Sequence, residues 1–352
     1  MSDDTTARPA LNTKKSILYG LVGLAVIVLI FVRVIPQIGS YQGALTAMKS
    51  MSAGSIAWVG VTVLVYLAVY GLPFMAATPG LAYWRSQQLN QGAFAISNGV
   101  PAGGAFGLGV QYAMLASYGV EPTVSTAAIT AVGVWSIFVT LVLPILGVAA
   151  LQVSGEDVSA YFWPAMLGLL ILVVAILAFA FVVRSENAAR RVGSLGNRML
   201  APIARRFSKV RNADLVSMLL GLRRDIAELV GRRWLAITGT QLSVSLTQFM
   251  IFYVALRGIE GWGSAGTSLL VAFGSFAVAQ IGLMIPITPG GLGTVDAAMI
   301  ALLTAFGVDA GVATAADLVW RAASFVPQMV VGAVALFTWS VHAGSRQASE
   351  SP

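Results

Sequence analysis

The stretch Pro286-Ile-Thr-Pro-Gly-Gly-Leu-Gly293 interrupts a long apolar region of the chain, and Pro101-Ala-Gly-Gly-Ala-Phe-Gly-Leu-Gly109 interrupts another. Proline ends helices, and glycine lets a second backbone or a ligand approach closely. Both stretches therefore predict irregular backbone between helices. In a membrane such backbone is tolerated only where it is buried in protein or lines a water-filled cavity. Each stretch is therefore either part of a binding cavity or a packing hinge between helices.

The composition indicates an integral membrane protein. Of the 352 residues, 57% are hydrophobic and 10% are charged, whereas a soluble domain carries about 25% charged residues. The apolar segments reach the roughly 20 residues that cross a bilayer as a helix, and they lack the alternating pattern of an outer-membrane barrel. The expected fold class is all-α: a polytopic membrane helical bundle with two Gly/Pro-broken helices.

Nine apolar segments are candidate membrane spans. One of them contains the first broken stretch, and a short one that follows the second stretch cannot cross a bilayer as a helix. The segments are residues 17–34, 54–77, 93–118, 124–151, 162–183, 235–256, 267–287, 295–306 and 312–341. The expected domains are a cytoplasmic tail at 1–16, a first membrane repeat at 17–183, a basic amphipathic linker at 184–233, a second membrane repeat at 234–341 and a tail at 342–352.

The two broken stretches resemble each other. Shifting the chain by 188 residues aligns residues 101–128 with residues 289–316 without a gap, and ten of the 28 aligned positions are identical. The shift places Pro101 on Pro289. An internal duplication with broken segments in corresponding places is a known pointer to the binding site of a transporter. The alternative is that membrane helices share a similar composition.

Basic residues concentrate in one segment. Residues 184–233 hold 12 of the 21 Lys and Arg residues and four acidic residues, a net charge of +8 against +7 for the whole chain. Because Lys and Arg favour cytoplasmic loops, this linker and the tail with Lys14 and Lys15 are expected in the cytoplasm. Apolar residues at helical spacing from Leu195 to Phe207 and from Leu215 to Leu229 predict amphipathic helices on anionic lipid. A purely topogenic loop is the alternative.

An even number of crossings must separate these two cytoplasmic segments, but five candidate spans lie between them. The simplest solution makes 93–118 a hairpin that returns to the side from which it starts. The second repeat would then do the same at 289–306, and the two halves would run parallel, each opening after a dibasic pair. If both broken segments cross fully, the halves are inverted.

Three ionisable residues fall within apolar segments. A charge at the bilayer centre costs at least about 2.5–3.5 kcal/mol, so such residues are functional candidates. Asp296 begins the short helix after Gly293, where the helix dipole alone would favour a carboxylate. Asp317 and Arg321 are four residues apart and share a helical face, either as part of a site or as a structural pair.

The catalytic inventory of the chain is small. It contains no cysteine and one histidine, His342, and it lacks a nucleophile elbow and a phosphate-binding loop. We therefore expect no enzyme activity, no catalytic residue, no metal, no cofactor and no nucleic-acid partner. Helix N-termini that begin in the broken stretches would instead aim N–H groups at an anion such as a lipid phosphate.

The run Pro289-Gly-Gly-Leu-Gly293 with Asp296, followed by Asp317-Leu-Val-Trp-Arg321, resembles the lysylphosphatidylglycerol synthase transmembrane-region family of flippase-like proteins. In that family a P-x-P-G-G-L-G stretch precedes an acid, usually Glu, and an Arg-bearing helix. Asn98-Gly-Val-Pro101 resembles the first-repeat counterpart, although Gly109-Val-Gln111 stands where the family usually has Gly-Glu and a following Arg. The resemblance covers nearly the whole chain and implies the translocating part without the aminoacyl-transferring domain.

The leading hypothesis is a flippase or transporter that moves a phospholipid or lipid-linked precursor across the cytoplasmic membrane, with the N-terminus in the cytoplasm. A non-transporting accessory subunit of a lipid-modifying glycosyltransferase or synthase is the alternative. The expected partners are a phospholipid or lipid-linked glycan headgroup, anionic lipids at the linker and, for the accessory role, a membrane enzyme.

The headgroup site is expected to combine residues of both broken stretches. Arg321 would contact phosphate, and the carboxylates would contact a cationic or hydroxylated headgroup. If the glycines face a wet cavity, Gly291→Leu should block transport with little loss of folded protein, whereas it should destabilise a packing hinge. The expected substrate-binding residues are Pro289, Gly290, Gly291, Gly293, Asp296, Asp317, Arg321, Asn98, Pro101, Gly103 and Gly104.

Overall fold

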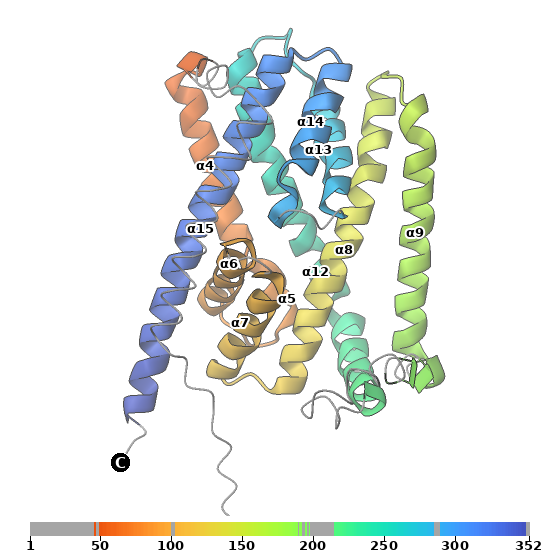
Figure 1. The fold of residues 1–352 in the computed structure, drawn as a ribbon, viewed down its shortest axis with the longest axis vertical. Helices are drawn as coiled ribbons and strands as arrows, with labels where there is room; N and C mark the ends of the chain where they lie inside the picture. The colour runs from red at the N-terminus through yellow and green to blue at the C-terminus, as the bar shows by residue number, and fades with distance from the viewer. Residues whose placement is uncertain are drawn as a thin grey trace, which may run out of the picture.

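The protein is a bundle of long helices (Figure 1). A computed structural model describes residues 46, 49–99, 103–188, 190–191, 194–195, 197, 215–284 and 289–349. Within these residues all regular structure is helical, so the expected all-α class is confirmed. The expected span at 17–34, the tail at 1–16 and Pro101 lie outside the described residues.

The helices fall into two groups along the chain. The first contains α4 (Ala53–Val69), α5 (Leu72–Ala77), α6 (Tyr83–Gly99), α7 (Gly103–Ser117), α8 (Pro122–Val153) and α9 (Ser159–Arg184). The second contains α12 (Leu215–Glu260), α13 (Leu269–Ala279), the 3-10 turns η2 (Gln280–Met284) and η3 (Pro289–Gly291), α14 (Thr294–Ala305) and α15 (Ala310–Ser349).

Five helical segments are long and apolar enough to cross a membrane: Ala53–Ala77, Pro122–Val153, Met166–Arg184, Arg223–Glu260 and Ala310–Val341. They contain or overlap the expected spans at 54–77, 124–151, 162–183, 235–256 and 312–341. The expected segment at 93–118 is divided between α6 and α7, and the expected segment at 267–287 between α13 and η2.

The outer surface of the bundle is apolar. Helix α9 exposes Leu170, Leu177 and Phe181 by about 60% each, and few residues in its most apolar stretch are buried. Buried residues of the interior include glutamine, serine, aspartate and arginine. This distribution is the reverse of that in a soluble protein and is the one a bilayer requires, because lipid solvates apolar side chains and cannot solvate polar ones.

Exposed tryptophans mark both ends of the apolar surface. Trp234 lies near the start of the membrane part of α12, and Trp262 follows the end of that helix; both are about half exposed. The 27 helical residues from 234 to 260 extend about 40 Å, which is close to the thickness of a bilayer with its headgroup regions. Tryptophan is enriched at these interfaces, so the two residues are suited to the two headgroup layers.

The linker expected at 184–233 is continuous with the following membrane helix. Helix α12 begins at Leu215 and crosses the expected domain boundary at residue 233 without a break. Part of its apolar face contacts protein, since Ile226 is buried and Leu229 packs with Ala76 and Ala77 of α5. This face therefore joins the linker to the bundle. The other amphipathic segment, at 195–207, lies mostly outside the described residues.

Two helical hairpins occupy opposite ends of the bundle (Figure 1). Helices α6 and α7 lie in the half toward which α15 ends, and α13 and α14 lie in the half where α15 begins. Helix α6 runs antiparallel to α7, since Gly103 adjoins the Ser97 carbonyl and Gly107 adjoins the Ala93 carbonyl. Each hairpin thus starts and finishes at one end of the bundle.

Helices α4 and α12 run in opposite directions along the bundle, and the expected parallel arrangement of the two halves stays a prediction, because it involves the span at 17–34 outside the described residues. Helix α4 runs toward the end of the bundle where α15 finishes, and α12 runs away from it (Figure 1). The parallel arrangement paired the span at 235–256 with the first span of the chain. The 188-residue shift instead pairs it with residues 47–68, most of which belong to α4.

Residues 188 positions apart adopt the same turn between helices. Helices α7 and α14 end at Ser117 and Ala305, and the next helices begin at Pro122 and Ala310. The glycines at 119 and 307 have φ angles of +81° and +88°, which side chains disfavour. The N–H groups of Val120 and Val308 each donate to the carbonyl five residues earlier at 3.0 Å. The local fold thus repeats with the sequence shift.

A glycine on α15 lets this helix pack tightly against α6. A Cβ atom at Gly332 would overlap the backbone carbonyl of Gln91 and lie 2.6 Å from the Cβ of Ala95. The contact is extended by Gln88, whose Nε2 donates to the Ala335 carbonyl at 3.2 Å. Close approach of two backbones through small residues is a main source of helix association in membranes.

We expect Gly332→Ala to destabilise the protein by about 1–3 kcal/mol, because the new methyl group meets backbone that cannot move without separating α6 from α15. Gly60→Ala on α4 is the control, since a Cβ there has no neighbour within 4 Å. Thermal unfolding of the purified variants in detergent measures the difference. Equal melting temperatures would show that the α6–α15 contact adapts to a methyl group.

Candidate functional site

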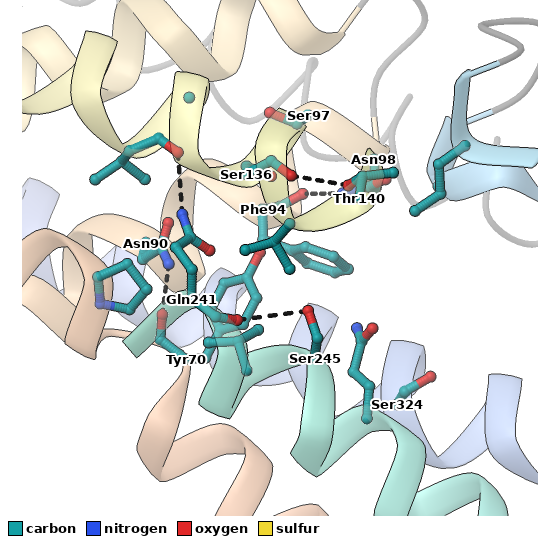
Figure 2. Close-up of a pocket in the computed structure, with 18 of the residues that line it drawn as sticks. Tyr70, Asn90, Phe94, Ser97, Asn98, Ser136, Thr140, Gln241, Ser245 and Ser324 are labelled. Carbon is teal, nitrogen blue, oxygen red and sulfur yellow. Dashed lines mark hydrogen bonds between the residues drawn. The ribbon is translucent and has the colours of Figure 1, made fainter. Parts of the chain in front are cut away.

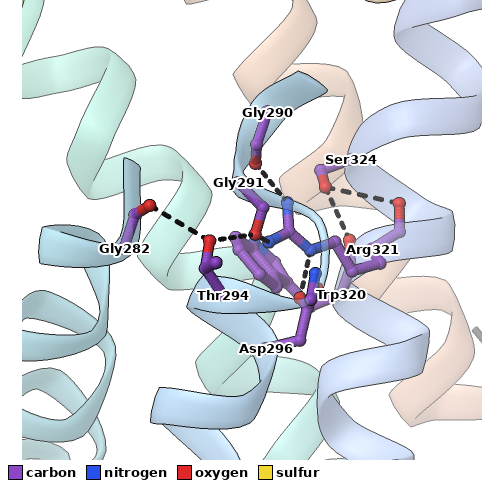
Figure 3. A network of polar contacts seen from close by, with 9 residues as sticks. Gly282, Gly290, Gly291, Thr294, Asp296, Trp320, Arg321 and Ser324 are labelled. Atoms are coloured by element: carbon purple, nitrogen blue, oxygen red, sulfur yellow. Dashed lines mark hydrogen bonds and ion pairs between the residues drawn. The ribbon is translucent and has the colours of Figure 1, made fainter. Parts of the chain in front are cut away.

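A buried ion pair joins α14 to α15 (Figure 3). Arg321 of α15 is 4% exposed, and its Nε donates to Oδ1 of Asp296, which is 3% exposed. The guanidinium lies over the ring of Trp320, with Cζ 4.4 Å from the ring centroid. A guanidinium with a carboxylate on one edge and an aromatic ring on its face is well compensated in a medium without water.

The glycine-rich turn provides two further acceptors for Arg321. Its Nη1 donates to the carbonyl of Gly290 at 3.1 Å, and Nη2 donates to the carbonyl of Gly291 at 3.4 Å. These two glycines have φ angles of +62° and +66°. Other residues rarely adopt this conformation, which directs the two carbonyls toward α15. The Pro-Gly-Gly sequence is therefore a binding turn for the arginine.

The N-terminus of α14 is already occupied by a carboxylate of the chain itself. Oδ2 of Asp296 accepts a hydrogen bond from the backbone N–H of Gly293 at 2.6 Å, while its Oδ1 accepts from Arg321. A carboxylate at this position satisfies N–H groups that the helix leaves unpaired. The expectation that these groups would point at a lipid phosphate does not describe this site.

Asp317 lies beside the ion pair without completing it. It is 1% exposed, it lies within electrostatic range of Asp296 and Arg321, and its Oδ1 has no hydrogen-bond partner among the described residues. The expected i, i+4 pair of Asp317 with Arg321 is thus replaced by a pair between helices. We call Asp296, Asp317 and Arg321 the charge cluster; with all three ionised its formal charge would be −1.

A cavity of about 670 Å³ lies next to the charge cluster, between the two hairpins and the long helices α8 and α12 (Figure 2). Arg321 and Gly290 form part of its wall. We call it the central cavity. Its volume falls in the range of protein pockets that hold small organic ligands.

Neutral polar groups line the central cavity. Arg321 is the one fully charged side chain among the lining residues that the structure describes. Amides and hydroxyls from α6, α7, α8, α12, η2 and α15 account for the rest of the polar lining: Asn90, Asn98, Gln111, Gln241, Gln248, Gln280, Ser97, Ser136, Thr140, Ser245 and Ser324. Apolar residues such as Val132, Phe276 and Leu283 form the rest of the lining, so the cavity combines polar and apolar walls and carries little charge.

Several lining amides are fixed by the backbone. Gln241 donates from Nε2 to the Val132 carbonyl at 3.0 Å, and Asn98 donates from Nδ2 to the Phe94 carbonyl at 3.0 Å (Figure 2). Gln248 donates to the hydroxyl of Tyr66 at 2.9 Å, and that hydroxyl donates to Oε1 of Gln328 at 2.7 Å. These bonds hold the amides in defined orientations.

The structure brings together only part of the expected site. Gly290, Arg321, Asn98 and Gly104 line the central cavity. The backbone of Pro289 belongs to the same turn as Gly290. Five of the expected residues do not line the cavity: Gly291, Gly293, Asp296, Asp317 and Gly103. Gly291 and Asp296 accept hydrogen bonds from Arg321, Gly293 donates to Asp296, and Asp317 lies close to the pair. Gly103 packs on the carbonyls of Ile96 and Ser97.

Gly291 faces packed side chains, which alters what its substitution would report. A Cβ there would lie 2.7 Å from Cγ2 of Val295 and 2.9 Å from Cδ2 of Leu283, at a φ of +66°. A leucine would therefore be destabilising whether or not the neighbouring cavity binds lipid. Of the two alternatives for Gly291, a wet cavity or a packing hinge, this geometry matches the packing hinge.

The polar lining of the cavity was not predicted from the sequence. Single amides and hydroxyls on α8 and α12 belong to no sequence motif. They form a common surface only when the helices pack together. One signal was present: α6 has five Asn and Gln residues in a chain that is otherwise strongly apolar. A polar helix of this kind in a membrane protein indicates a surface turned away from lipid.

We expect Asp296→Asn to destabilise the protein by about 3–5 kcal/mol, since the buried guanidinium of Arg321 loses the carboxylate that contacts it. Asp317→Asn is the matched control and should preserve or raise stability, because it removes a buried carboxylate whose Oδ1 is unpaired. Thermal unfolding in detergent measures both. A loss from Asp317→Asn as large as that from Asp296→Asn would show that Arg321 depends on both carboxylates.

The fold and the site define a polytopic α-helical membrane protein with a neutral polar cavity beside a buried charge cluster. The chain belongs to the family described as lysylphosphatidylglycerol synthase TM region, whose sequence profile matches residues 20–332. The match covers the hairpins, the charge cluster and every residue that lines the central cavity. Comparison with curated proteins gave no match.

Proposed function

We propose that the protein is a lipid flippase or transporter that moves a phospholipid or lipid-linked precursor across the cytoplasmic membrane. The observation that carries this proposal is the central cavity, a polar chamber enclosed by helices whose outer surfaces are apolar. Polar volume inside a membrane bundle is expensive unless a ligand or water uses it. A headgroup in the cavity could keep its acyl chains in the surrounding lipid.

In this proposal the two halves of the bundle are inverted repeats, and this arrangement permits alternating access. In this proposal both hairpins re-enter the membrane from opposite sides, and their tips meet near its midplane. Their proximity is direct, since a Cβ at Gly290 would lie 3.4 Å from Oδ1 of Asn98 at the tip of the other hairpin. Inverted repeats with broken helices at a central site are the architecture of many transporters, in which rocking of one repeat against the other opens each side in turn.

We expect Gly133→Leu to abolish lipid translocation in proteoliposomes while leaving the melting temperature nearly unchanged. Gly133 lines the central cavity, and a Cβ there has no neighbour within 4 Å, so leucine would fill the chamber. Gly168→Leu is the matched control because it places the same side chain on α9, outside the cavity and also in open space.

Translocation can be followed as the loss of fluorescence of labelled lipids when a reductant is added outside. A Gly133→Leu protein that moves lipid at the wild-type rate would contradict the proposal. A wild-type protein that moves no lipid but co-purifies with a membrane glycosyltransferase or synthase would favour the accessory role.

The expected topology places the basic end of α12 in the cytoplasm, because Arg223, Arg224, Arg232 and Arg233 lie there. The chain has no cysteine, so a single introduced cysteine is the only thiol of the protein that a maleimide can label. Gly221→Cys should react with a membrane-impermeant maleimide only after the cells are opened. Gly263→Cys, beyond the other end of α12, should react in intact cells. Both glycines lie in open space. Labelling in the opposite order would reverse the orientation.

A further inference from the structure

We infer that the group which enters the central cavity is an uncharged polyhydroxylated headgroup, of the glycerol, inositol or glycosyl class. This inference rests on the proposed function and specifies its substrate class. It starts from the hydrogen-bonding capacity that the cavity leaves unused, and from the absence of carboxylates among its described lining residues.

Two amides offer hydrogen bonds that the protein does not satisfy. Gln280 is 4% exposed, lines the cavity, and has no hydrogen-bond partner for its Nε2 among the described residues. Gln111, from the opposite hairpin, lines the same cavity and makes no hydrogen bond to a described residue. Leaving the buried amide of Gln280 unpaired costs about 1–3 kcal/mol; its Nε2 is itself buried in the cavity wall, so a ligand recovers this free energy when the side chain turns toward the cavity, whereas Gln111 is only partly buried.

The lining matches hydroxyl groups better than it matches a cation. An amide has both donors and acceptors, and a hydroxyl can satisfy either. Ser97 and Ser136 add hydroxyls that can also act in both ways (Figure 2). An ammonium headgroup has donors alone and would need a carboxylate, but the carboxylates of Asp296 and Asp317 lie outside the lining. A cation would therefore remain uncompensated in the cavity.

The lining also disfavours a headgroup with excess negative charge. Arg321 is the single charged group of the lining, and its Nε, Nη1 and Nη2 each donate to an acceptor of the protein. Asp296 neutralises it at contact distance, and the second carboxylate, Asp317, is close by. Arg321 can still give its remaining N–H groups to one phosphodiester oxygen, which every phospholipid carries, and so fix the ligand next to Gly290.

The test measures lipid binding to the purified full-length protein as a rise in melting temperature. The probes share their acyl chains and differ in the headgroup: phosphatidylinositol, phosphatidylglycerol, phosphatidylethanolamine, lysyl-phosphatidylglycerol and phosphatidic acid. The detergent must carry no sugar, because a maltoside would itself present hydroxyls to the cavity. We expect the inositol and glycerol lipids to bind about ten-fold more tightly than phosphatidic acid, and the two lipids with ammonium groups in the headgroup, phosphatidylethanolamine and lysyl-phosphatidylglycerol, to bind no more tightly than phosphatidic acid.

Variants assign the preference to the cavity. Gln280→Leu and Gln111→Leu should each reduce the advantage of the inositol lipid over phosphatidic acid, whereas Gln152→Leu, on an exposed part of α8 outside the cavity, should leave it unchanged. Gln111 is only partly buried, so its variant remains informative should Gln280→Leu fail to fold.

Two results would overturn the inference: tighter binding of ethanolamine or lysyl lipid than of inositol lipid, or a polyol preference that survives both amide substitutions. The same lipids in the translocation assay separate this inference from the proposed function. Polyol-selective binding without movement of any lipid refutes transport and supports the ligand class. If only the two lipids with ammonium headgroups are moved, transport is supported and the polyhydroxylated ligand class is refuted.

Discussion

The region around the central cavity depends on one buried cation, the guanidinium of Arg321. A lone charge at this depth is unstable, and the protein offsets it from three directions. Asp296 provides the counter-charge, the Gly290 and Gly291 carbonyls accept from the outer nitrogens, and Trp320 covers the face. Asp296 lies at the start of α14, the two glycines form a turn with positive φ angles, and Trp320 precedes Arg321 in α15.

These contacts fix the position of the second hairpin. Its tip cannot withdraw from α15 without separating Arg321 from Asp296 and from the two carbonyls. The tip forms one side of the central cavity through Gly290, so the ion pair sets the shape of the chamber as well as the packing of the helices. The charged groups pair with one another and with the glycine turn, and apart from Arg321 the polar side chains in the described cavity lining are neutral.

Composition and spacing were enough to predict the helical membrane fold, the breaks at Gly103 and Gly290, and the three buried charges. They did not predict which charges would pair. Sequence spacing identifies neighbours within one helix, so it indicated an ion pair between Asp317 and Arg321. The observed ion pair instead joins two helices, next to a turn with positive φ at Gly290 and Gly291.

The ion pair also bears on how the chain enters the membrane. Asp296 and Arg321 are separated by 25 positions, which is one short helix, one turn and the start of the next helix. Two charges so close along the chain can meet while both helices are still emerging from the insertion machinery. Neither then has to face lipid alone at the cost of several kcal/mol. The short separation therefore suits α14 and α15 to insertion as one neutralised hairpin.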